Sequence, residues 1–388
     1  MNVHALHFGR FLCWCLALLL FPAARGWAGN GVYVIGHMTN STDAADWALE
    51  KKANALEADL RFDDWGTPTE FKHGWPCDCP DNKYVPTYAD SVCPHLGDSP
   101  CNAATAAAEL LQHVAGNQRL ALFIVDSKVN ARMTEKTLKA AGTKVITLLE
   151  QNLFEKGYAG RVVVGSSSLK TYAYLEAAAT QASLLPPQYA SRIYFTIDGE
   201  GHDLTGVLNQ LVKLSPNRVY GTGISALAPG DYEDTISVAA YNQQEGVTGL
   251  TYIWTIDAGS SMLRYLRNGA QGVMTNFPET LYRITQEQGI SLATPRDEIP
   301  AATNTTVYRQ FPGDCDCDYQ KGAGCSITTA APANLACRCK DKSKSCAGKV
   351  VICLDQTSPF CTSPTKSIES CLQGQGNCAG YKNVPGAS

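Results

Sequence analysis

The 388-residue chain lacks several features that would define a class of protein. After residue 28, no apolar run reaches the roughly 20 residues that a transmembrane helix needs. Basic residues do not outnumber acidic ones, and the formal net charge is −4. Cysteine is absent between residues 102 and 314. The missing apolar runs predict no transmembrane anchor, and the missing positive charge argues against a nucleic acid or another polyanion as partner.

The first 28 residues have the pattern of a secretory signal peptide. Arg10 precedes an apolar run from Phe11 to Phe21, and small residues at Gly26 and Ala28 suit cleavage. Its removal would leave 30 basic and 36 acidic residues, a net charge of −6. The alternative is a buried helix at the start of the fold. We expect a secreted, extracellular protein.

The 16 cysteines agree with secretion. Beyond the two in the leader, four lie between residues 77 and 101 and ten between residues 315 and 378. Even numbers in two separate clusters are typical of disulfide bonds formed in an oxidising compartment. Zinc is the alternative for the Cys-x-Cys pairs, but the wider spacings do not match a zinc finger or ribbon.

From residue 31 to about 290, β-rich apolar runs alternate with helix-like stretches. The predicted strands are 32–36, 55–62, 120–126, 161–165, 192–198, 218–223, 250–257 and 272–276. Eight βα units over this length are typical of a (β/α)8 TIM barrel, an α/β fold. An open, doubly wound sheet is the alternative, but no glycine-rich phosphate-binding fingerprint follows the first strand.

The chain divides into four predicted parts. Residues 1–28 are the signal peptide, 29–300 the barrel, 301–312 a linker and 313–388 a small Cys-rich module. The last part has few large apolar residues and needs disulfide bonds to be stable. Two glycosylation sequons begin at Asn40 and Asn304, and a glycan on Asn40 would crowd the predicted site described next.

Polar residues recur at the ends of the predicted strands, where barrel enzymes keep their active sites. They are His37, the pair Glu57 and Asp59, Asp126 with Lys128, Asp198, Trp254, Asp257 and Asn276. A single such residue is often only a turn or cap. Recurrence on six of the eight strands indicates a functional site.

Glu57 and Asp59 are two residues apart on one strand, so both carboxylates point to the same face. Two adjacent like charges resist joint ionisation unless a cation lies between them. With Asp126 they offer three oxygen ligands, which suit Mg²⁺ or Ca²⁺. The alternative is that these acids pair with Lys128, Arg61 or another base.

Two histidines accompany the carboxylates. His37 follows the first strand, and His73 lies 11 residues after Phe62. Imidazole transfers protons near neutral pH, so the pair would supply a nucleophile or base and an acid. Lys128 would stabilise charge on phosphate oxygens, and Asp78 could orient His73. Tyr252 and Trp254 share a strand face and form either an aromatic wall for a quaternary ammonium or ordinary barrel packing.

Several motifs, in order over residues 31–300, resemble those of the sphingomyelinase D/phospholipase D toxin-like family of spider venoms. They are Ile35-Gly36-His37-Met38-Thr39-Asn40, Leu56-Glu57-Ala58-Asp59, Phe62-Asp63-Asp64, His73-Gly74-Trp75-Pro76-Cys77-Asp78-Cys79, Val125-Asp126-Ser127-Lys128, Tyr252-Ile253-Trp254-Thr255-Ile256-Asp257 and Gly272-Val273-Met274-Thr275-Asn276-Phe277-Pro278. The chain is more distantly similar to glycerophosphodiester phosphodiesterases. Residues 293–297 resemble the segment that plugs the base of the family's barrel, although Glu298-Ile299 departs from its usual form.

The resemblance implies a lyase or hydrolase of lipid degradation. His37 and His73 would be the catalytic pair, with Mg²⁺ held by Glu57, Asp59 and Asp126. Substrate would be bound by Lys128, Asp198, Tyr252, Trp254 and Asn276, with Asp78 and Asp257 in support. The family releases the head-group alcohol of sphingolipids or lysophospholipids at a membrane surface, often giving a cyclic phosphate.

Two other functions remain open on the sequence. One is a glycerophosphodiester phosphodiesterase that acts on soluble substrates. The other is an inactive adhesive or binding protein, against which every proposed catalytic position holds a competent residue. The Cys-rich tail, which the venom enzymes lack, would bind an extracellular partner or serve as a spacer. The cysteines available to the loop after His73 also differ from the family's pattern, which leaves the preferred head group undetermined.

Overall fold

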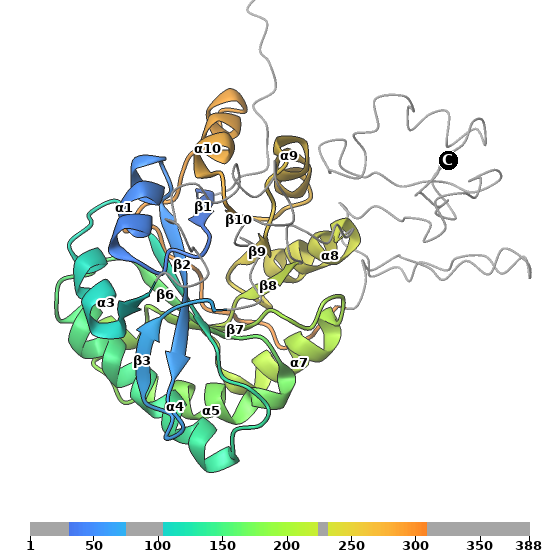
Figure 1. Ribbon diagram of the computed structural model, residues 1–388. Helices are drawn as coiled ribbons and strands as arrows, with labels where there is room; N and C mark the ends of the chain where they lie inside the picture. Colours follow the sequence, from blue (N-terminus) through green and yellow to red (C-terminus); the bar gives the residue numbers. More distant parts are fainter. Residues whose placement is uncertain (1–30, 75–103, 224–231, 309–388) are drawn as a thin grey trace, which may run out of the picture.

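The structure of the chain is a computed structural model that describes residues 31–74, 104–223 and 232–308 (Figure 1). The predicted signal peptide, Asp78 and every cysteine lie outside the described residues. The expected disulfide bonds, and the Cys-rich module as a whole, therefore stay predictions.

Eight strands of the described residues form a parallel barrel. They are β1 (Tyr33–Gly36), β2 (Ala55–Phe62), β5 (Leu122–Ser127), β6 (Arg161–Ser166), β7 (Ile193–Ile197), β8 (Tyr220–Gly223), β9 (Thr251–Trp254) and β10 (Gly272–Thr275). Their order in the sheet is β7-β6-β5-β2-β1-β10-β9-β8. Each of the eight predicted strands is present at the expected place.

The barrel is nearly closed. A single parallel bridge, Phe195 with Arg218, joins β7 to the segment before β8. Phe195 donates its N–H to the carbonyl of Asn217 at 3.0 Å and accepts from Val219 at 3.0 Å. Since successive strands are neighbours all the way round, the sheet is a (β/α) barrel and not the doubly wound alternative.

Helices cover the outside of the barrel (Figure 1). They are α1 (Thr42–Glu50), α3 (Ala107–Ala115), α4 (Glu135–Leu149) with a π-helical turn at Glu150–Phe154, α5 (Tyr172–Ala182), α6 (Pro187–Ala190), α7 (Leu204–Leu214), α8 (Glu233–Gln244), α9 (Gly259–Arg267) and α10 (Pro278–Glu287). Ser41, Thr134 and Asp203 cap helices α1, α4 and α7 by accepting backbone N–H bonds.

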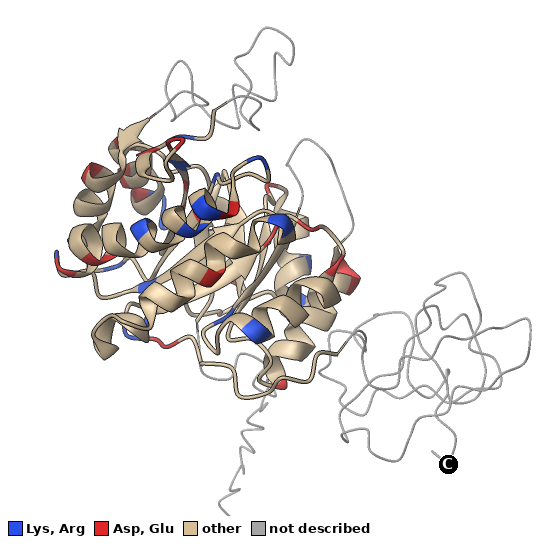
Figure 2. Cartoon of the chain, turned by 90° about the horizontal axis from the view of Figure 1, so that it is seen from below, with Lys and Arg blue, Asp and Glu red and all other residues tan. Residues whose placement is uncertain are grey.

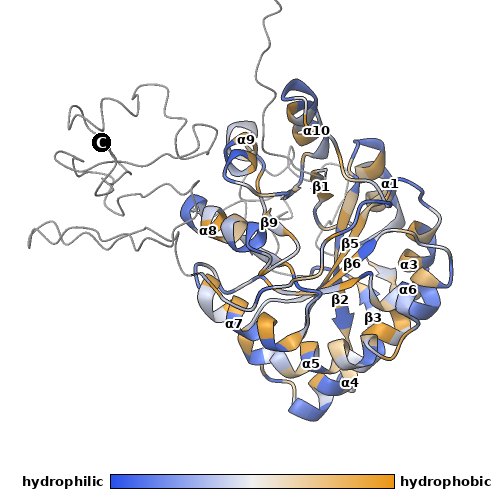
Figure 3. Cartoon of the chain, turned by 180° about the vertical axis from the view of Figure 1, so that it is seen from behind, coloured by the Kyte–Doolittle hydropathy of each residue, from blue (hydrophilic) through white to orange (hydrophobic). Residues whose placement is uncertain are grey.

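The outer helices are amphipathic. Figure 3 shows hydrophobic and hydrophilic residues alternating along them, whereas β5 and β6 are mostly hydrophobic. In the view of Figure 2, acidic and basic residues are interspersed over the helices. Among the described residues, no helix has the length and apolar character to cross a membrane.

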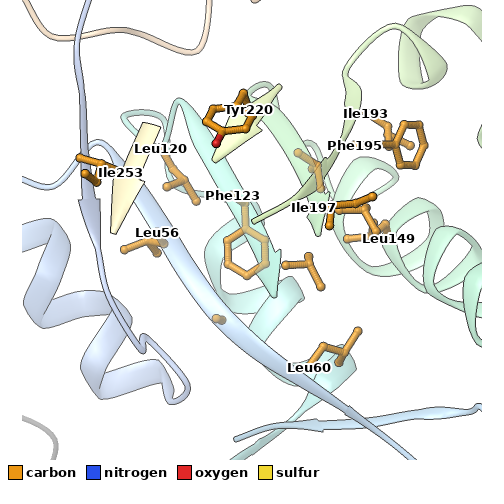
Figure 4. Close-up of a cluster of buried hydrophobic side chains, with 14 of the residues drawn as sticks. Leu56, Leu60, Leu120, Phe123, Leu149, Ile193, Phe195, Ile197, Tyr220 and Ile253 are labelled. Carbon is orange, nitrogen blue, oxygen red and sulfur yellow. The ribbon is translucent and has the colours of Figure 1, made fainter. Parts of the chain in front are cut away.

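The strands separate two hydrophobic cores because successive side chains point to opposite faces. Leu56, Phe123 and Ile253 belong to the outer core between strands and helices (Figure 4). Ala55, Leu122 and Tyr252 belong to the smaller core inside the barrel. Inward positions nearer the carboxyl ends of the strands are polar, and this change from apolar to polar marks where the barrel interior becomes a pocket.

β2 continues into a hairpin that the sequence reasoning did not predict. β3 (Pro68–Phe71) returns antiparallel to β2, and β4 (Thr105–Ala106) pairs with β3. Phe71 is fully buried and meets Phe123 edge to face, with 5.9 Å between ring centroids. The hairpin thereby brings the chain back to the carboxyl end of β2, and His73 follows directly.

The segment after α10 closes the other end of the barrel. Leu292 bridges Val32, while Ala293 and Ile299 are buried in the inner core. The Tyr194 hydroxyl donates to the Ile299 carbonyl. The predicted plug at 293–297 thus lies at the base of the barrel, and Ile299 fills the same core.

Candidate active site

A cavity of about 220 Å³ lies at the carboxyl ends of the strands. Its lining includes eight residues that the sequence proposed for the site: His37, Glu57, Asp59, His73, Asp126, Lys128, Asp198 and Trp254. These residues come from six separate segments of the chain, between positions 37 and 254. The fold therefore brings together side chains that the sequence only placed at similar points of successive strands.

Three carboxylates meet at one side of the cavity. One oxygen from each of Glu57, Asp59 and Asp126 lies within 4.8 Å of the others. Register explains the arrangement, because Asp59 pairs with Asp126 across β2 and β5. Glu57 is 2% exposed and Asp59 is 1% exposed, so their charges cannot be screened well by water.

Lys128 only partly balances this charge. Its Nζ lies 2.7 Å from Asp59 Oδ1 and 2.5 Å from Asp126 Oδ2. The sequence left open that the acids form ion pairs with Lys128, and Lys128 does pair with Asp59 and Asp126. A single lysine cannot neutralise all three carboxylates, however. The second oxygen of Asp126, Oδ1, is buried without a hydrogen-bond partner among the described residues.

The pKa shifts follow from this imbalance. Burial, with the charges of Asp59 and Asp126, raises the pKa of Glu57 well above its usual value. Burial also acts to raise the pKa of Asp59, but Lys128 and His73 outweigh it and lower that pKa to about 2. A divalent cation would relieve the repulsion that Glu57 experiences and give Asp126 Oδ1 a partner. The donor set thus fits a hard divalent metal.

A hydrogen-bonded chain fixes the orientation of His37. Asn276 donates from Nδ2 to Asp257 Oδ2 and from its backbone N–H to Asp257 Oδ1, each at 2.9 Å. Because an ionised carboxylate only accepts, the Asn276 amide must direct its oxygen at His37 Nδ1, 2.9 Å away. His37 therefore carries its proton on Nδ1 when neutral, and Nε2 is left with a lone pair.

His73 lies two residues after the end of β3 and lines the cavity. Its Nδ1 is 2.9 Å from the carbonyl oxygen of Gly74, which can only accept. Nδ1 of His73 is thus the donor, and Nε2 is again the nitrogen left for chemistry. Asp78, proposed to orient His73, lies outside the described residues.

A third group of residues joins β7 to β9. Tyr252 donates its hydroxyl to Asp198 Oδ2 at 2.7 Å, and the Trp254 indole donates to the Asp198 carbonyl at 3.2 Å. Burial and the charge of Asp126 raise the pKa of Asp198 to about 7, although the Tyr252 bond opposes the rise. Tyr252 is fully buried beneath the cavity, whereas Trp254 lines it. A Cβ at Gly221 would overlap the Tyr252 ring, so glycine on β8 makes room for it.

The sequence reasoning missed four residues of the site. Ser167, Gly199 and Met274 line the cavity. Asn40 is 1% exposed, donates to Asp59 Oδ2 at 2.6 Å and accepts from the Asp59 backbone N–H at 2.7 Å. Both polar atoms of the Asn40 amide are thus engaged in the folded protein, which leaves no room for a glycan at this sequon. Ser167 directly follows β6 and Gly199 lies two residues after the end of β7, so their position at strand ends could have identified them from the sequence.

A (β/α) barrel whose mouth joins two histidines to a carboxylate triad defines an enzyme equipped for metal-assisted acid–base chemistry. Comparison with known proteins narrows the class. Residues 29–298 match the family described as dermonecrotic toxin SPH. The chain therefore belongs to that family, which confirms the resemblance drawn from its motifs, and it is an enzyme of the phosphodiesterase or lyase type.

Relatives by sequence include dermonecrotic toxin SpeSicTox-betaIIA1 of Sicarius peruensis, which is 27% identical over 67% of this chain and 93% of its own length. The dermonecrotic toxin SPH of Ixodes scapularis is 25% identical over 72% of this chain and 75% of its own. A solved structure from Silicibacter pomeroyi, provisionally named a glycerophosphoryl diester phosphodiesterase, shares 15% identity. Its TM-score is 0.48, and the match covers 68% of this chain and 96% of that one. The assignment of the fold rests on the strand order.

Proposed function

We propose that the chain is a secreted phospholipase D or sphingomyelinase D-like phosphodiesterase that releases the head-group alcohol from sphingolipids or lysophospholipids. One observation carries the proposal: the cavity gathers two histidines, each hydrogen-bonded through Nδ1 to a carbonyl oxygen, around a buried carboxylate triad. Membership of the dermonecrotic toxin SPH family supports a lipid phosphodiester as the substrate. A glycerophosphodiester phosphodiesterase is the second candidate, and an inactive binding protein is disfavoured by the family and by the intact site.

We assign the divalent ion as Mg²⁺, held by Glu57, Asp59 and Asp126. When bound, Mg²⁺ would neutralise charge on the non-bridging phosphate oxygens. Three carboxylates would leave coordination positions for water and substrate oxygens, which is common where Mg²⁺ is bound next to phosphates. Lys128, which bridges two of the acids, keeps a positive charge on the same side of the cavity.

The histidines supply the proton transfers. His37 Nε2 takes the proton of a substrate hydroxyl, and that oxygen attacks phosphorus. The bond from phosphorus to the head-group oxygen breaks, and His73, which starts the step protonated on both ring nitrogens, transfers its Nε2 proton to the departing alkoxide and becomes neutral. An internal hydroxyl as nucleophile gives a cyclic phosphate, and both histidines return to their starting states by proton exchange. Asn276 and Asp257 keep His37 in the tautomer that this step needs.

Asp198 and Trp254 would contact the head group, with the Trp254 ring as the surface for a quaternary ammonium, while the buried Tyr252 would orient Asp198 through its hydroxyl. Asn276 serves the site through His37. The predicted Cys-rich module would act outside the barrel, as an extracellular contact or a spacer. Extracellular action agrees with the leader and with the toxin names of the relatives.

Phosphorus NMR of lipids digested with the mature protein tests the proposal. We expect a new cyclic-phosphate resonance from lysophosphatidylcholine or sphingomyelin with Mg²⁺, and no reaction after chelation by EDTA.

His37→Ala and His73→Ala should each lower turnover by about 100-fold or more. Glu57→Ala should instead weaken Mg²⁺ binding, measured by titration calorimetry. Turnover of glycerophosphocholine in preference to the lipids would favour the second candidate, and near-normal turnover by either histidine variant would exclude the mechanism.

A further inference from the structure

We infer that Arg61 is a positioning residue that holds the catalytic His73 over the metal ligands. The inference rests on the proposed function, because it assigns Arg61 a role only through His73. Arg61 is not part of the cavity lining, and none of the ion pairs in the described residues includes it. Its guanidinium instead donates hydrogen bonds to the backbone carbonyl groups of Lys72 and His73.

Arg61 lies on the same strand face as the metal ligands. Glu57, Asp59 and Arg61 alternate along β2, so their side chains point the same way. β2 runs toward the mouth of the barrel, which places Arg61 one step beyond Asp59 in that direction. A single strand therefore presents the carboxylates and, next to them, the cation that reaches the hairpin segment.

The guanidinium clamps two consecutive carbonyls. Nε of Arg61 donates to the carbonyl oxygen of Lys72 at 3.0 Å, and Nη2 donates to the carbonyl oxygen of His73. The planar fork of an arginine can make two such bonds in a fixed geometry, whereas a lysine or glutamine cannot reproduce both. The orientation of the two peptide units on either side of His73 is thereby tied to β2.

Two further contacts complete the clamp. The backbone N–H of Lys72 donates to the Asp59 carbonyl at 2.7 Å, so residue 72 is held by β2 from both of its polar backbone groups. Gly74 has a φ of +80° and packs directly on the guanidinium, where any Cβ would overlap Nη2. Glycine is favoured next to His73 by its backbone conformation, and a Cβ there would also displace the Arg61 guanidinium from its position.

This arrangement matters because β3 ends at Phe71, two residues before His73. No strand pairing holds the backbone of His73 itself within the described residues. Arg61 supplies the missing restraint. A displacement of about 1 Å in a catalytic group costs on the order of 100-fold in rate, so loss of the clamp should lower kcat while substrate binding and metal binding persist.

The test compares Arg61→Gln and Arg61→Lys with the control Arg119→Gln, which changes an exposed arginine away from the site. Choline release from lysophosphatidylcholine is measured with Mg²⁺, together with calorimetric Mg²⁺ affinity and thermal unfolding. For both Arg61 variants we expect kcat to fall about 10- to 100-fold, KM and Mg²⁺ affinity to change less than about 3-fold, and the control to match wild type. Arg61→Lys keeps the charge, so an equal loss assigns the effect to the fork geometry.

A substrate with an activated leaving group separates positioning from a general defect. 2-Hydroxypropyl p-nitrophenyl phosphate keeps an internal hydroxyl for the attack on phosphorus and releases an anion that needs no proton from His73. The Arg61 variants should therefore lose at least about 10-fold less activity on it than on the lipid. Equal losses on both substrates, or weakened Mg²⁺ binding, would overturn the inference. So would Arg61 variants with wild-type kcat while His73→Ala is inactive. If His73→Ala itself is active, the proposed function fails instead.

Discussion

At the scale of single residues, the site depends on groups that have only one way to satisfy their hydrogen bonds. Asp257 can only accept, so Asn276 must turn its oxygen to His37. The Gly74 carbonyl fixes the donor nitrogen of His73 in the same way. In both histidines a hydrogen bond occupies Nδ1, so Nε2 is the nitrogen that can transfer a proton to or from the substrate. The neighbouring residues, and not the imidazole alone, determine this choice.

Asn276→Ala should remove the group that fixes the His37 tautomer. We expect kcat to decrease by up to about 100-fold, which is the size of the contribution from acid–base catalysis. The Mg²⁺ affinity should be unchanged. Steady-state kinetics on lysophosphatidylcholine and calorimetry measure the two quantities. Thr275→Val is the matched control, because it removes another donor to Asp257, at 3.0 Å, and leaves the bond to His37. Equal losses in the two variants would contradict the tautomer argument.

Asp198 should make the metal-free protein less stable as the pH rises. Its folded pKa is raised from 3.8 to about 7, so the folded state retains a proton that the unfolded chain releases. The free energy of unfolding should therefore fall between about pH 4 and 7 by up to about 1.4 kcal/mol per pKa unit. Above this window both states are ionised, and the penalty is constant.

Urea unfolding in EDTA at a series of pH values measures this dependence. Asp198→Asn should make the decline between about pH 4 and 7 smaller, and the part that remains is due to Glu57, whose pKa is also raised. Asp64→Asn, at an exposed position of the hairpin turn, should leave it as in wild type. A decline of the same size in the Asp198 variant would show that other groups cause it.

At the scale of elements, two segments outside the eight parallel strands complete the barrel: the β2–β3 hairpin and the segment after α10. The hairpin carries His73 back to the carboxylates, and the segment closes the base of the barrel. Asn54 connects this base to β1. Its side chain accepts from the Val34 N–H at 2.7 Å and donates to the carbonyls of Val32, at 3.0 Å, and Ala293, at 2.8 Å.

Asn54→Ala should therefore destabilise the barrel more than a typical polar substitution. It leaves buried backbone groups without partners, and each costs about 1–3 kcal/mol. We expect the free energy of unfolding to fall by about 3 kcal/mol or more, measured by urea denaturation. Gln112→Ala, which breaks an exposed bond to Asn152, should cost less than about 1 kcal/mol. A small effect at Asn54 would mean that the plug is not held through this side chain.

At the scale of the whole molecule, the barrel extends past the predicted boundary at residue 300. Ala302 donates to the Pro216 carbonyl at 2.8 Å, and Arg218 donates to the Asn304 carbonyl at 2.7 Å. Tyr308 donates its N–H to Asn242 at 2.9 Å and meets Tyr241 edge to face. The first part of the predicted linker thus lies on the barrel, while the division into domains stays a proposal.

Truncation tests that proposal. A chain that ends after Tyr308 should fold and keep lipid turnover within about 3-fold of the full mature protein, because the described contacts of the barrel are retained. A chain that ends after Ile290 loses Ala293 and Ile299 from the inner core and should unfold or aggregate. Circular dichroism and turnover assays measure both. Loss of activity in the longer chain would show that the Cys-rich part is needed by the barrel.

The sequence by itself determined the strands, the parallel barrel and most residues of the cavity. Each strand is specified by apolar residues at successive positions, and the polar residue at its end is visible because it interrupts that run. These signals are local. They gave the inward face of β2 at Glu57 and Asp59, although Arg61, the next residue on the same face, was considered only as an ion-pair partner.

Only the tertiary structure decided which of these residues touch. Lys128 bridges Asp59 and Asp126, Asn40 is engaged by Asp59, and Arg61 binds the carbonyl of His73. Each contact joins segments whose distance depends on strand register, twist and the path of the hairpin. Such partners are set by non-local packing, which no local pattern of residues encodes, and for this reason the sequence named the members of the site but not their pairings.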